Sequence, residues 1–357
     1  MPKSLYIACT QASGGKTAVA SGLCLALRER GLKVGYFKPV GVVSASALAS
    51  NEAPFDEDAS FVADLLELDD ELSDICPVVL HEDALHDVFD PSEADPMSRV
   101  TAAYERVRQS KDIVVCEGLG EIWQGRFLRA SGADVVEQLD LMTLLIAKFA
   151  GTRLLDDVLY VKEALKHRLM GVLFNMVPES RLDLVRDQYV PRLSQSGVTS
   201  YGELATNPRL AAVSVAELVT ALDGAYLCGE RHAEELVETY MIGAMNPSHA
   251  LHHFRLTPDK AVIVGGDRTK IILSALETPT VAVVLTGNYI PEPSILARAE
   301  ERGIALISVA GDTVTAADDL RHLFGRLRVR QSAKIDLMAR IITESLDLDR
   351  LVADLEG

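Results

Sequence analysis

Short apolar runs alternate with amphipathic segments along the first half of the chain. The apolar runs predict strands at residues 5–9, 33–37, 112–116, 141–147 and 170–175. The segments between them predict helices at residues 16–30, 58–68, 96–110 and 153–167. Because strands that are apolar throughout are buried on both faces, this order predicts a parallel sheet covered by helices on both sides.

The pattern ends with a short strand and a turn inside residues 201–213 and restarts near residue 226. The second series predicts strands at residues 260–264, 281–285 and 305–309, and helices at residues 234–241, 268–276, 294–302, 334–342 and 346–355. We therefore expect an α/β protein with a parallel-sheet domain over residues 1–225 and a smaller α/β domain over residues 226–357.

The segment TQASGGKT, residues 10–17, follows the first strand and opens the first helix. Gly14 and Gly15 allow the backbone to pass close to a phosphate group, and Lys16 supplies a positive charge. The Thr17 hydroxyl can reach a Mg²⁺ ion, and the helix presents its positive end to the same place. This setting favours a nucleotide site over an ordinary glycine-rich turn and makes the first domain P-loop NTPase-like.

Polar residues also follow two other strands of the predicted sheet. Lys38, in FKPV, ends the second strand, and Glu117-Gly118 ends the DIVVC strand. Ligands of open parallel sheets bind at the carboxyl ends of the strands, so both side chains are expected at the P-loop crevice. A solvated lysine before a proline-led turn is the alternative for Lys38. Glu117 can hold Mg²⁺ directly or through water, and Asp56 or Asp58 can add a ligand, although an acidic helix N-terminus explains these two aspartates almost as well.

Charge and composition exclude several classes of binding partner. The 357 residues carry a formal net charge of −17, which argues against general binding of nucleic acid or anionic membranes, because both need clustered cations. A nucleotide needs only one local positive site. We find no secretory signal and no long apolar span, and so expect a cytoplasmic protein. The five cysteines show no CxxC spacing, which argues against a zinc site or a disulfide framework.

Four motifs in the first domain, taken in order, resemble the dethiobiotin synthetase-like group of P-loop proteins. That group has a threonine where Thr10 stands, a KPV motif matched by residues 38–40, and an acid before glycine matched by Glu117. Its GVxxN strand is matched by GVLFN, which ends at Asn175. This chain departs from the group at Cys9, where the group has glycine, and at Ala12, where it has a second threonine. Residues 45–58 do not reproduce the substrate loop of the group.

The resemblance implies ATP and Mg²⁺ as ligands and gives the matched positions their roles. Phosphate binding is implied for the loop residues Thr10, Gly14, Gly15, Lys16 and Thr17. Metal binding is implied for Thr17 and Glu117, with Asp58 as a further candidate. Adenine recognition is implied for Asn175, and Lys38 is the candidate catalytic residue.

The second domain contains the turn Gly265-Gly266-Asp267-Arg268 between a predicted strand and a predicted helix. Two glycines before a helix N-terminus can bind an anion, and Arg268 can bind phosphate or carboxylate. The alternative is a tight turn in which Asp267 caps the helix. The segment KAVIVGGDRT resembles the DRTGG domain, which makes these four residues a candidate ligand site of a regulatory or assembly domain.

A synthetase-like P-loop domain followed by a DRTGG domain resembles the N-terminal region of long bacterial phosphate acetyltransferases. In those enzymes a catalytic acetyltransferase domain follows, whereas this sequence stops at Gly357. The start at Met1 and the helical tail favour a stand-alone protein over a fragment. Acetyl transfer is therefore not expected.

Three functions are consistent with these features. The first is a Mg-ATP-binding protein that senses a nucleotide or a small metabolite, with the second domain binding a ligand or mediating assembly into a homo-oligomer. The second is an ATP-dependent ligase or synthetase that activates a carboxylate or carbamate, with Lys38 neutralising the developing charge. The third is a scaffold in which GGKT has no role. The sequence leaves open whether ATP is hydrolysed and what the second domain binds.

Overall fold

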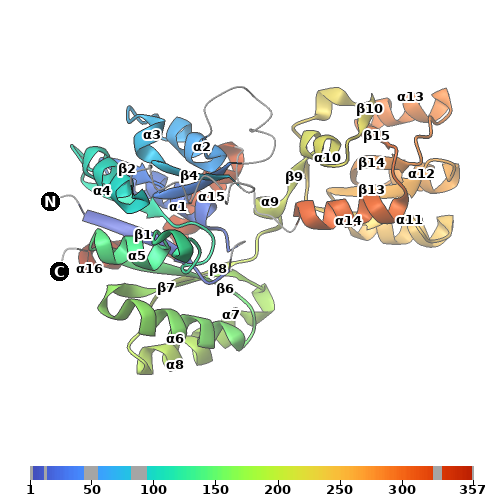
Figure 1. Ribbon diagram of the computed structural model, residues 1–357. Helices are drawn as coiled ribbons and strands as arrows, with labels where there is room; N and C mark the ends of the chain where they lie inside the picture. Colours follow the sequence, from blue (N-terminus) through green and yellow to red (C-terminus); the bar gives the residue numbers. More distant parts are fainter. Residues whose placement is uncertain (1–2, 12–13, 44–54, 82–94, 325–331, 356–357) are drawn as a thin grey trace. The chain divides into compact units, whose positions relative to one another are not determined.

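The chain folds into two compact units in the computed structural model, which describes residues 3–11, 14–43, 55–81, 95–324 and 332–355 (Figure 1). Unit 1 comprises Met1–Thr206 and Val329–Gly357, and unit 2 comprises Asn207–Arg328. This division differs from the boundary expected at residues 225–226. Residues 207–225 belong to the second unit, and the C-terminal tail returns to the first. Residue 12 and most of residues 45–58 lie outside the described part of the chain.

Unit 1 is built on a parallel sheet of six strands in the order β2-β5-β1-β6-β7-β8. These strands are β1 (Lys3–Cys9), β2 (Val34–Phe37), β5 (Ile113–Glu117), β6 (Met142–Lys148), β7 (Leu169–Val177) and β8 (Thr199–Ala205). A small parallel pair is formed by β3 (Val40–Val43) and β4 (Val78–His81). The parallel sheet predicted from the apolar runs is thereby confirmed.

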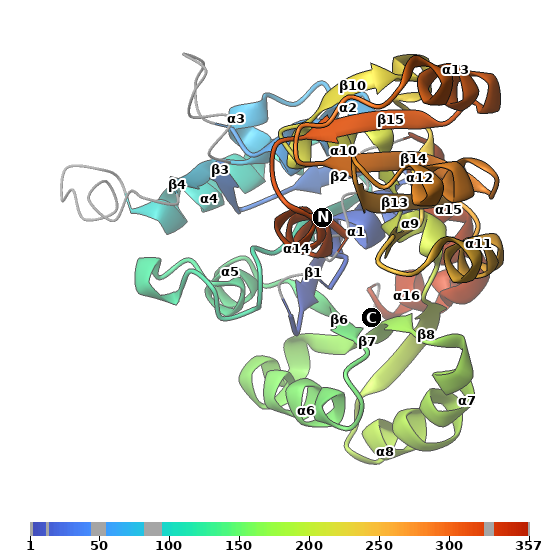
Figure 2. The same cartoon turned by 90° about the vertical axis from the view of Figure 1, so that its right-hand side faces the viewer.

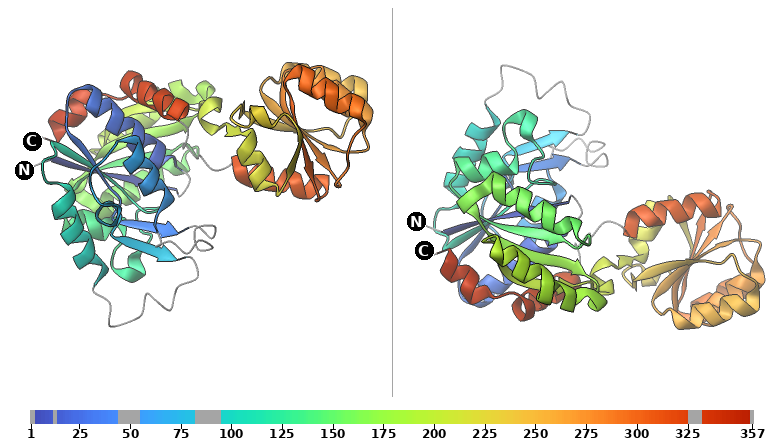
Figure 3. Two further views of the ribbon diagram at one scale, coloured as in Figure 1. Left: turned by 90° about the horizontal axis from the view of Figure 1, so that it is seen from above. Right: turned by 90° about the horizontal axis from the view of Figure 1, so that it is seen from below.

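Helices cover both faces of this sheet (Figure 3). One face buries a continuous apolar cluster against α4 (Pro96–Val107), α5 (Gly132–Gln138), α6 (Arg153–Leu165) and α8 (Val190–Gln195). The other face carries α1 (Lys16–Glu29) and α15 (Ser332–Ser345). The remaining helices of unit 1 are α2 (Glu57–Leu65), α3 (Leu72–Ile75), α7 (Leu182–Leu184) and α16 (Leu348–Asp354).

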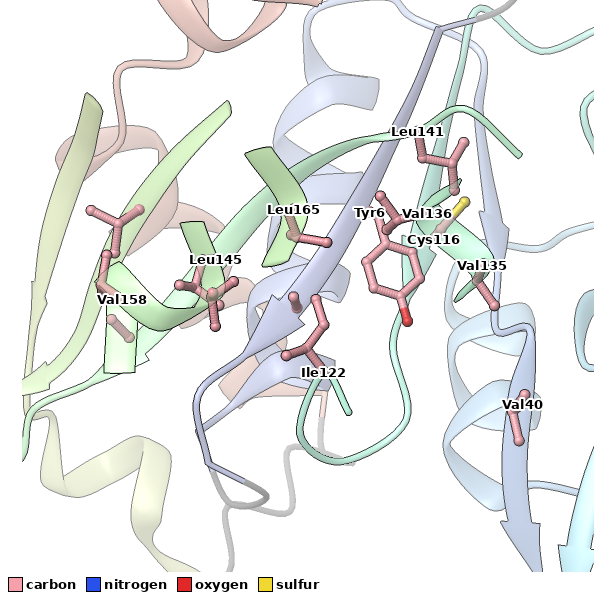
Figure 4. Close-up of a cluster of buried hydrophobic side chains, with 14 of the residues drawn as sticks. Tyr6, Val40, Cys116, Ile122, Val135, Val136, Leu141, Leu145, Val158 and Leu165 are labelled. Atoms are coloured by element: carbon pink, nitrogen blue, oxygen red, sulfur yellow. The ribbon is translucent and has the colours of Figure 1, made fainter. Parts of the chain in front are cut away.

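Tyr6 of β1 links this core to the edge of the sheet where functional residues gather. Its ring lies close to Val135 and Val136 of α5, with Ile122 near the hydroxyl end (Figure 4). A Cβ atom on Gly118 would lie only 2.6 Å from the Tyr6 hydroxyl oxygen, so that position has room for glycine alone. The buried tyrosine thus requires glycine at residue 118, directly after Glu117.

The C-terminal tail completes unit 1. Helix α15 packs on α1 at Gly22, where a Cβ atom would lie 2.7 Å from the Met338 side chain. The Tyr201 hydroxyl of β8 donates a hydrogen bond of 2.5 Å to Asp354 of α16. The predicted tail helices are confirmed, but they belong to the first unit because the absence of a side chain at Gly22 lets α15 approach α1 closely.

Unit 2 contains a mixed sheet of five strands in the order β10-β15-β14-β13-β12, in which only β10 runs antiparallel to its neighbour (Figure 2). The strands of the unit are β9 (Val213–Ser214), β10 (Ala225–Cys228), β11 (Leu236–Val237), β12 (Thr239–Ile242), β13 (Lys260–Gly265), β14 (Thr280–Thr286) and β15 (Ala305–Val309). Its helices are α9 (Pro208–Ala211), α10 (Val215–Ala221), α11 (Pro247–Leu256), α12 (Thr269–Leu276), α13 (Pro293–Arg302) and α14 (Thr313–Phe324).

Two apolar clusters lie on opposite faces of this sheet. Helices α10 and α14 bury one, and helices α11, α12 and α13 bury the other. The helix predicted at residues 234–241 is wrong, since β11 and β12 occupy that segment. The residues of β12 have high β-propensity, and they pair in parallel with β13, so sheet formation overrides the helical spacing of the nearby glutamates. No helix among the described residues of either unit combines the length and apolarity that crossing a membrane requires.

Candidate nucleotide-binding site

The loop between β1 and α1 ends in an open helix terminus. Gly15 adopts a left-handed backbone with φ 84°, which glycine accommodates without strain, and α1 begins at the next residue, Lys16. No side chain from the described residues caps the first turn of this 14-residue helix. Because the first N–H groups of a helix have no partners within it, this end of α1 is available to an anion.

Two buried polar side chains of the loop lack partners among the described residues. Lys16 is 7% exposed, and within the described ranges no carboxylate forms an ion pair with it. Thr10 is 4% exposed, and its hydroxyl meets no hydrogen-bond partner in the same part of the chain. Burying an uncompensated cation or hydroxyl is unfavourable, so both groups fit the presence of a bound anion.

The Cys9 side chain packs against the loop at Gly14. A Cβ atom on Gly14 would collide with the Cys9 sulfur, so the thiol fills the space that a side chain at residue 14 would need. Burial raises the pKa of the Cys9 thiol, although the nearby Lys16 charge opposes the rise. The thiol is therefore a neutral packing group, and Gly14 is required by its volume.

Glu117 is held by two hydroxyl groups at the end of β5. Thr17 donates a hydrogen bond of 2.6 Å to its Oε1 atom, and Tyr36 donates one of 2.8 Å to its Oε2 atom. Glu117 itself is only 1% exposed. The structure thus brings the P-loop threonine and the predicted metal-binding acid into direct contact. Tyr36 is a functional candidate that the sequence did not reveal, because a tyrosine in a buried strand is typical of core packing.

Lys38 lies next to the same carboxylate and two others. Its Nζ atom is 2.8 Å from Asp56 Oδ1, 3.5 Å from Asp58 Oδ2 and 3.9 Å from Glu117 Oε1. Asp56 also caps α2 by accepting a hydrogen bond of 2.9 Å from the Ala59 amide. The solvated-lysine alternative is therefore wrong, and the interpretation of Asp56 and Asp58 as an acidic helix N-terminus is confirmed.

Electrostatic coupling in this group is strong. Burial alone would lower the pKa of Lys38, but the charges of Glu117, Asp56 and Asp58 outweigh it and hold that pKa above its ordinary value. Burial raises the pKa of Glu117, and the charge of Lys38 opposes the rise, as do the hydrogen bonds from Thr17 and Tyr36. Burial, and then the charge of Glu117, raise the pKa of Tyr36, which keeps its hydroxyl a hydrogen-bond donor. The protonation of each of these groups therefore depends on the charge of its neighbours.

Asn175, near the end of β7, contacts the P-loop directly. Its Nδ2 atom donates a hydrogen bond of 2.7 Å to the Gly14 carbonyl, and its Oδ1 atom accepts one of 2.9 Å from the Met176 amide. A carboxamide has two N–H donors and two acceptor lone pairs, so one of each remains for another partner. Recognition of adenine by Asn175 stays a prediction, and the bond to the loop is an additional feature.

Oxygen ligands for Mg²⁺ are present. No cluster of three or more Asp, Glu, His or Cys side chains suited to a metal occurs within the part of the chain that the structure describes. Mg²⁺ does not need one, because it is usually bound by one or two carboxylates together with phosphate oxygens and waters. The adjacent Thr17 hydroxyl and Glu117 carboxylate fit that requirement. Participation of Asp58, whose side chain is 39% exposed, stays a prediction.

The turn Gly265–Arg268 lies at the carboxyl end of β13 in unit 2. Arg268 donates hydrogen bonds of 2.7 Å to the Gly243 carbonyl and 3.1 Å to the Met245 carbonyl. A Cβ atom on Gly266 would collide with Tyr289. Helix α12 begins at Thr269, and no side chain of the described residues caps it, so the expectation that Asp267 caps this helix is wrong. Anion binding at these four residues stays a prediction.

Comparison with known proteins places both units in families. A model described as an AAA domain matches residues 3–221, and a model described as a DRTGG domain matches residues 217–323. The chain is 24% identical to a phosphate acetyltransferase of Synechocystis sp., over 83% of this chain and 43% of the relative. It is 28% identical to an ATP-dependent dethiobiotin synthetase of Clostridium novyi, over 51% of this chain and 79% of the relative.

One solved structure with a related description contains the CBS and DRTGG domains of a Clostridium perfringens pyrophosphatase complexed with diadenosine tetraphosphate. It is 18% identical over 45% of this chain and 76% of that chain, with a TM-score of 0.29. The chain spans about half the length of the phosphate acetyltransferases that it matches, 43% and 51% in two cases. The chain therefore belongs to the AAA domain family in its dethiobiotin synthetase-like P-loop form, joined to a DRTGG domain as in the N-terminal region of phosphate acetyltransferases.

Proposed function

We propose that this chain is a cytoplasmic Mg-ATP-binding protein that senses a nucleotide or a small metabolite. The observation that carries the proposal is Lys16, a buried cation at the open N-terminus of α1 that has no acidic partner in the described ranges. The orphan hydroxyl of Thr10 lies in the same loop. A polyphosphate satisfies both groups and the helix terminus together.

In this proposal the residues of the site divide the binding of phosphate, metal ion and adenine among them. Lys16 and the loop amides around Gly14 and Gly15 bind phosphate oxygens, while Thr17 and Glu117 hold Mg²⁺. The ion, when bound, neutralises part of the phosphate charge. Asn175 uses its remaining donor and acceptor for the adenine edge.

For unit 2 we propose a regulatory role. The DRTGG match covers most of this unit, whereas the P-loop match ends near its start, at residue 221. We expect it to bind a small metabolite near Gly265–Arg268 or to assemble the chain into a homo-oligomer. Sedimentation with and without Mg-ATP would measure the assembly state.

Calorimetry with Mg-ATP tests nucleotide binding. We expect Lys16→Ala to lower the affinity at least about tenfold, because it removes the one buried cation of the loop. Lys111→Ala is the matched control, since Lys111 pairs with Asp70 at 2.7 Å, outside the P-loop group, and its loss should leave the affinity unchanged. Absence of binding by the unaltered chain, or equal affinity in Lys16→Ala, would contradict the proposal.

The position of Lys38 favours one other function, an ATP-dependent ligase or synthetase acting on a carboxylate or carbamate. Its ammonium group is 3.9 Å from Glu117, which the P-loop threonine also contacts, so it can approach the same phosphate. Such a cation stabilises charge that develops during acyl phosphate formation. Phosphate release that requires an added small acid and disappears in Lys38→Ala would support this function, and ATP binding without such turnover counts against it.

A further inference from the structure

Three carboxylates surround the ammonium group of Lys38. One ammonium group lies within 4 Å of three carboxylates, at 2.8 Å from Asp56, 3.5 Å from Asp58 and 3.9 Å from Glu117. The side chains of Lys38 and Asp56 are 6% exposed and that of Glu117 is 2% exposed, so water screens these charges poorly. The Asp58 side chain, 39% exposed, is the one that reaches solvent.

Hydrogen bonds hold the carboxylates of Asp56 and Glu117 in place, whereas Lys38 has a longer side chain that can move. Asp56 accepts hydrogen bonds from the Val42 and Ala59 amides, at 2.9 Å each, in addition to its contact with Lys38. Glu117 is fixed by Thr17 and Tyr36. Lys38, in contrast, has four side-chain torsions and approaches all three acids with one point charge. A second cation entering this group would therefore displace the ammonium group and leave the carboxylates in place.

We infer that Lys38 is a built-in counter-cation of the three carboxylates and that it competes with a divalent metal ion for Glu117, which together with Thr17 would hold the ion. This inference rests on the proposed function for the metal role of Thr17 and Glu117. An ion of charge two is attracted to the carboxylates more strongly than one ammonium group, but it must overcome the repulsion from Lys38 to enter. Removing the positive charge of Lys38 therefore strengthens metal binding.

The consequence for the site is a coupling between metal and anion. Without a metal ion, the positive charge of Lys38 is neutralised inside the protein and is withheld from a ligand. A metal ion held by Glu117 would repel the ammonium group of Lys38, which could then pair with a phosphate or carboxylate of the ligand. Metal and anionic ligand thus favour each other through Lys38, and the coupling is reciprocal.

Titration of the full chain with Mn²⁺ alone, followed by electron paramagnetic resonance in the absence of nucleotide, tests the inference. We expect Lys38→Met to bind Mn²⁺ about tenfold more tightly than the unaltered chain, since one repelling charge is lost. Lys111→Met is the control, because it also frees a carboxylate, Asp70, from a lysine 2.7 Å away. It should leave the tightest Mn²⁺ site unchanged. Equal or weaker binding in Lys38→Met overturns the inference.

A second pair of variants covers the case in which Lys38→Met does not fold. Lys38→Met combined with Asp56→Asn removes one charge of each sign and keeps Glu117 and Thr17. It should bind Mn²⁺ more tightly than Asp56→Asn alone, and thermal unfolding should show a larger stabilisation by Mg²⁺ in the double variant. Equal values in the two proteins contradict the role of Lys38.

The outcome is separable from that of the proposed function. Loss of Mg-ATP binding in Lys16→Ala tests the nucleotide site, whereas the Mn²⁺ titration contains no nucleotide. If ATP binds but Lys38→Met does not change Mn²⁺ affinity, Lys38 is a fixed structural partner of Asp56 and the inference alone fails. If Mn²⁺ binding rises but ATP does not bind, the proposed function fails alone.

Discussion

Cys9 and Gly14 show at the residue scale how the P-loop is packed. The Cys9 sulfur occupies the volume that a methyl group on residue 14 would take. Gly14 also gives its carbonyl to Asn175 at 2.7 Å, so its position is fixed from two sides. A glycine is therefore required at residue 14 by the volume of the Cys9 side chain.

We predict that Gly14→Ala lowers the affinity for Mg-ATP about tenfold, the effect of a steric clash of 1–3 kcal/mol in a packed site. Cys9→Ala in the same chain should restore most of the affinity, because it vacates the space. Calorimetry measures both. Cys24→Ala combined with Gly14→Ala is the control, since Cys24 is equally buried but remote from Gly14, and should restore nothing. Failure of Cys9→Ala to rescue would show that the clash is not the cause.

Tyr36 carries a second prediction at this scale. Tyr36→Phe removes the hydrogen bond of 2.8 Å to Glu117, and such bonds to charged groups contribute about 1.5–3 kcal/mol. We expect weaker Mg-ATP binding. The bond holds down the pKa of Glu117, so its loss raises that pKa further, and the defect should grow as the pH falls and Glu117 takes up a proton.

Calorimetry over a pH series measures this effect. Tyr104→Phe is the matched variant, because it loses a hydrogen bond of 2.6 Å to Ser4 in the same unit without contacting Glu117. It should bind Mg-ATP normally at every pH. A defect in Tyr36→Phe that does not depend on pH would argue that the tyrosine acts through packing and not through the carboxylate.

The sequence predicted which residues lie together at the edge of the sheet better than it predicted their contacts. Lys16, Thr17, Lys38 and Glu117 follow strands of one parallel sheet, and strand order alone brings such residues to one edge. The contact between Asn175 and Gly14 and the role of Tyr36 depend on side-chain directions across neighbouring strands, which no local pattern encodes. For the same reason Arg268 appeared free to bind an anion, although its guanidinium group donates to two backbone carbonyls.

Lys260 is an unusual residue at the scale of single elements. It begins β13, is completely buried, and donates to the Pro279 carbonyl at 2.9 Å and to the Thr278 hydroxyl at 3.4 Å. No carboxylate pairs with it among the described residues, and its ammonium group lies 5.8 Å from the centre of the Phe254 ring. Burial lowers the pKa of Lys260 to about 8, against the opposing charge of Asp259.

This lowered pKa predicts a pH-dependent stability of unit 2. Between about pH 8 and the ordinary lysine value near 10.4, the unfolded chain binds more protons than the folded chain, so the free energy of unfolding should rise with pH. Below pH 8 the full cost of the buried charge is present. The stability of the unaltered chain relative to Lys260→Met should therefore increase from pH 8 to pH 10, as measured by denaturant unfolding.

Lys270→Met provides the comparison, because Lys270 is an exposed lysine of α12 in the same unit. Its stability should follow that of the unaltered chain across the pH series. If Lys260→Met shows the same pH slope as the unaltered chain, Lys260 is not the group responsible.

Elements were predicted well where their apolar pattern was long. The buried strands β1, β5, β6, β7 and β15 agree with the predicted runs to within two residues at each end. The pattern failed at residues 234–241, where two short strands alternate with glutamates, and it did not reveal β3 and β4, which are four residues each. Short strands are stabilised by their partners in the sheet and carry little local information.

The arrangement of the whole chain makes unit 2 an insertion in unit 1. The chain leaves unit 1 after Thr206 and returns at Val329, and the returning helix α15 packs on α1 beside the P-loop helix residue Gly22. The sequence predicted a single boundary along the chain, and a single boundary cannot describe a unit made of two separate segments. No local pattern indicated the return, because the approach of α15 to α1 depends on a contact between residues more than 300 positions apart.

We predict that a chain ending at residue 225 is much less stable than one in which residues 207–328 are replaced by a flexible linker. The first lacks α15 and exposes the apolar face of α1, whereas the second retains every helix of unit 1. Thermal unfolding and Mg-ATP calorimetry on both proteins measure the difference. Equal stability of the two would show that α15 is dispensable for unit 1.

The insertion also links the two units through chain entropy alone. When unit 2 is folded, its own contacts hold Asn207 and Phe324, the first residue and the last described residue of the unit, at a fixed separation. When unit 2 unfolds, docking α15 onto α1 must close a long flexible loop, and the entropy of that closure opposes the folding of unit 1. A ligand that stabilises unit 2 therefore also favours the docked α15 and the helix that carries Lys16, even if the two units never touch.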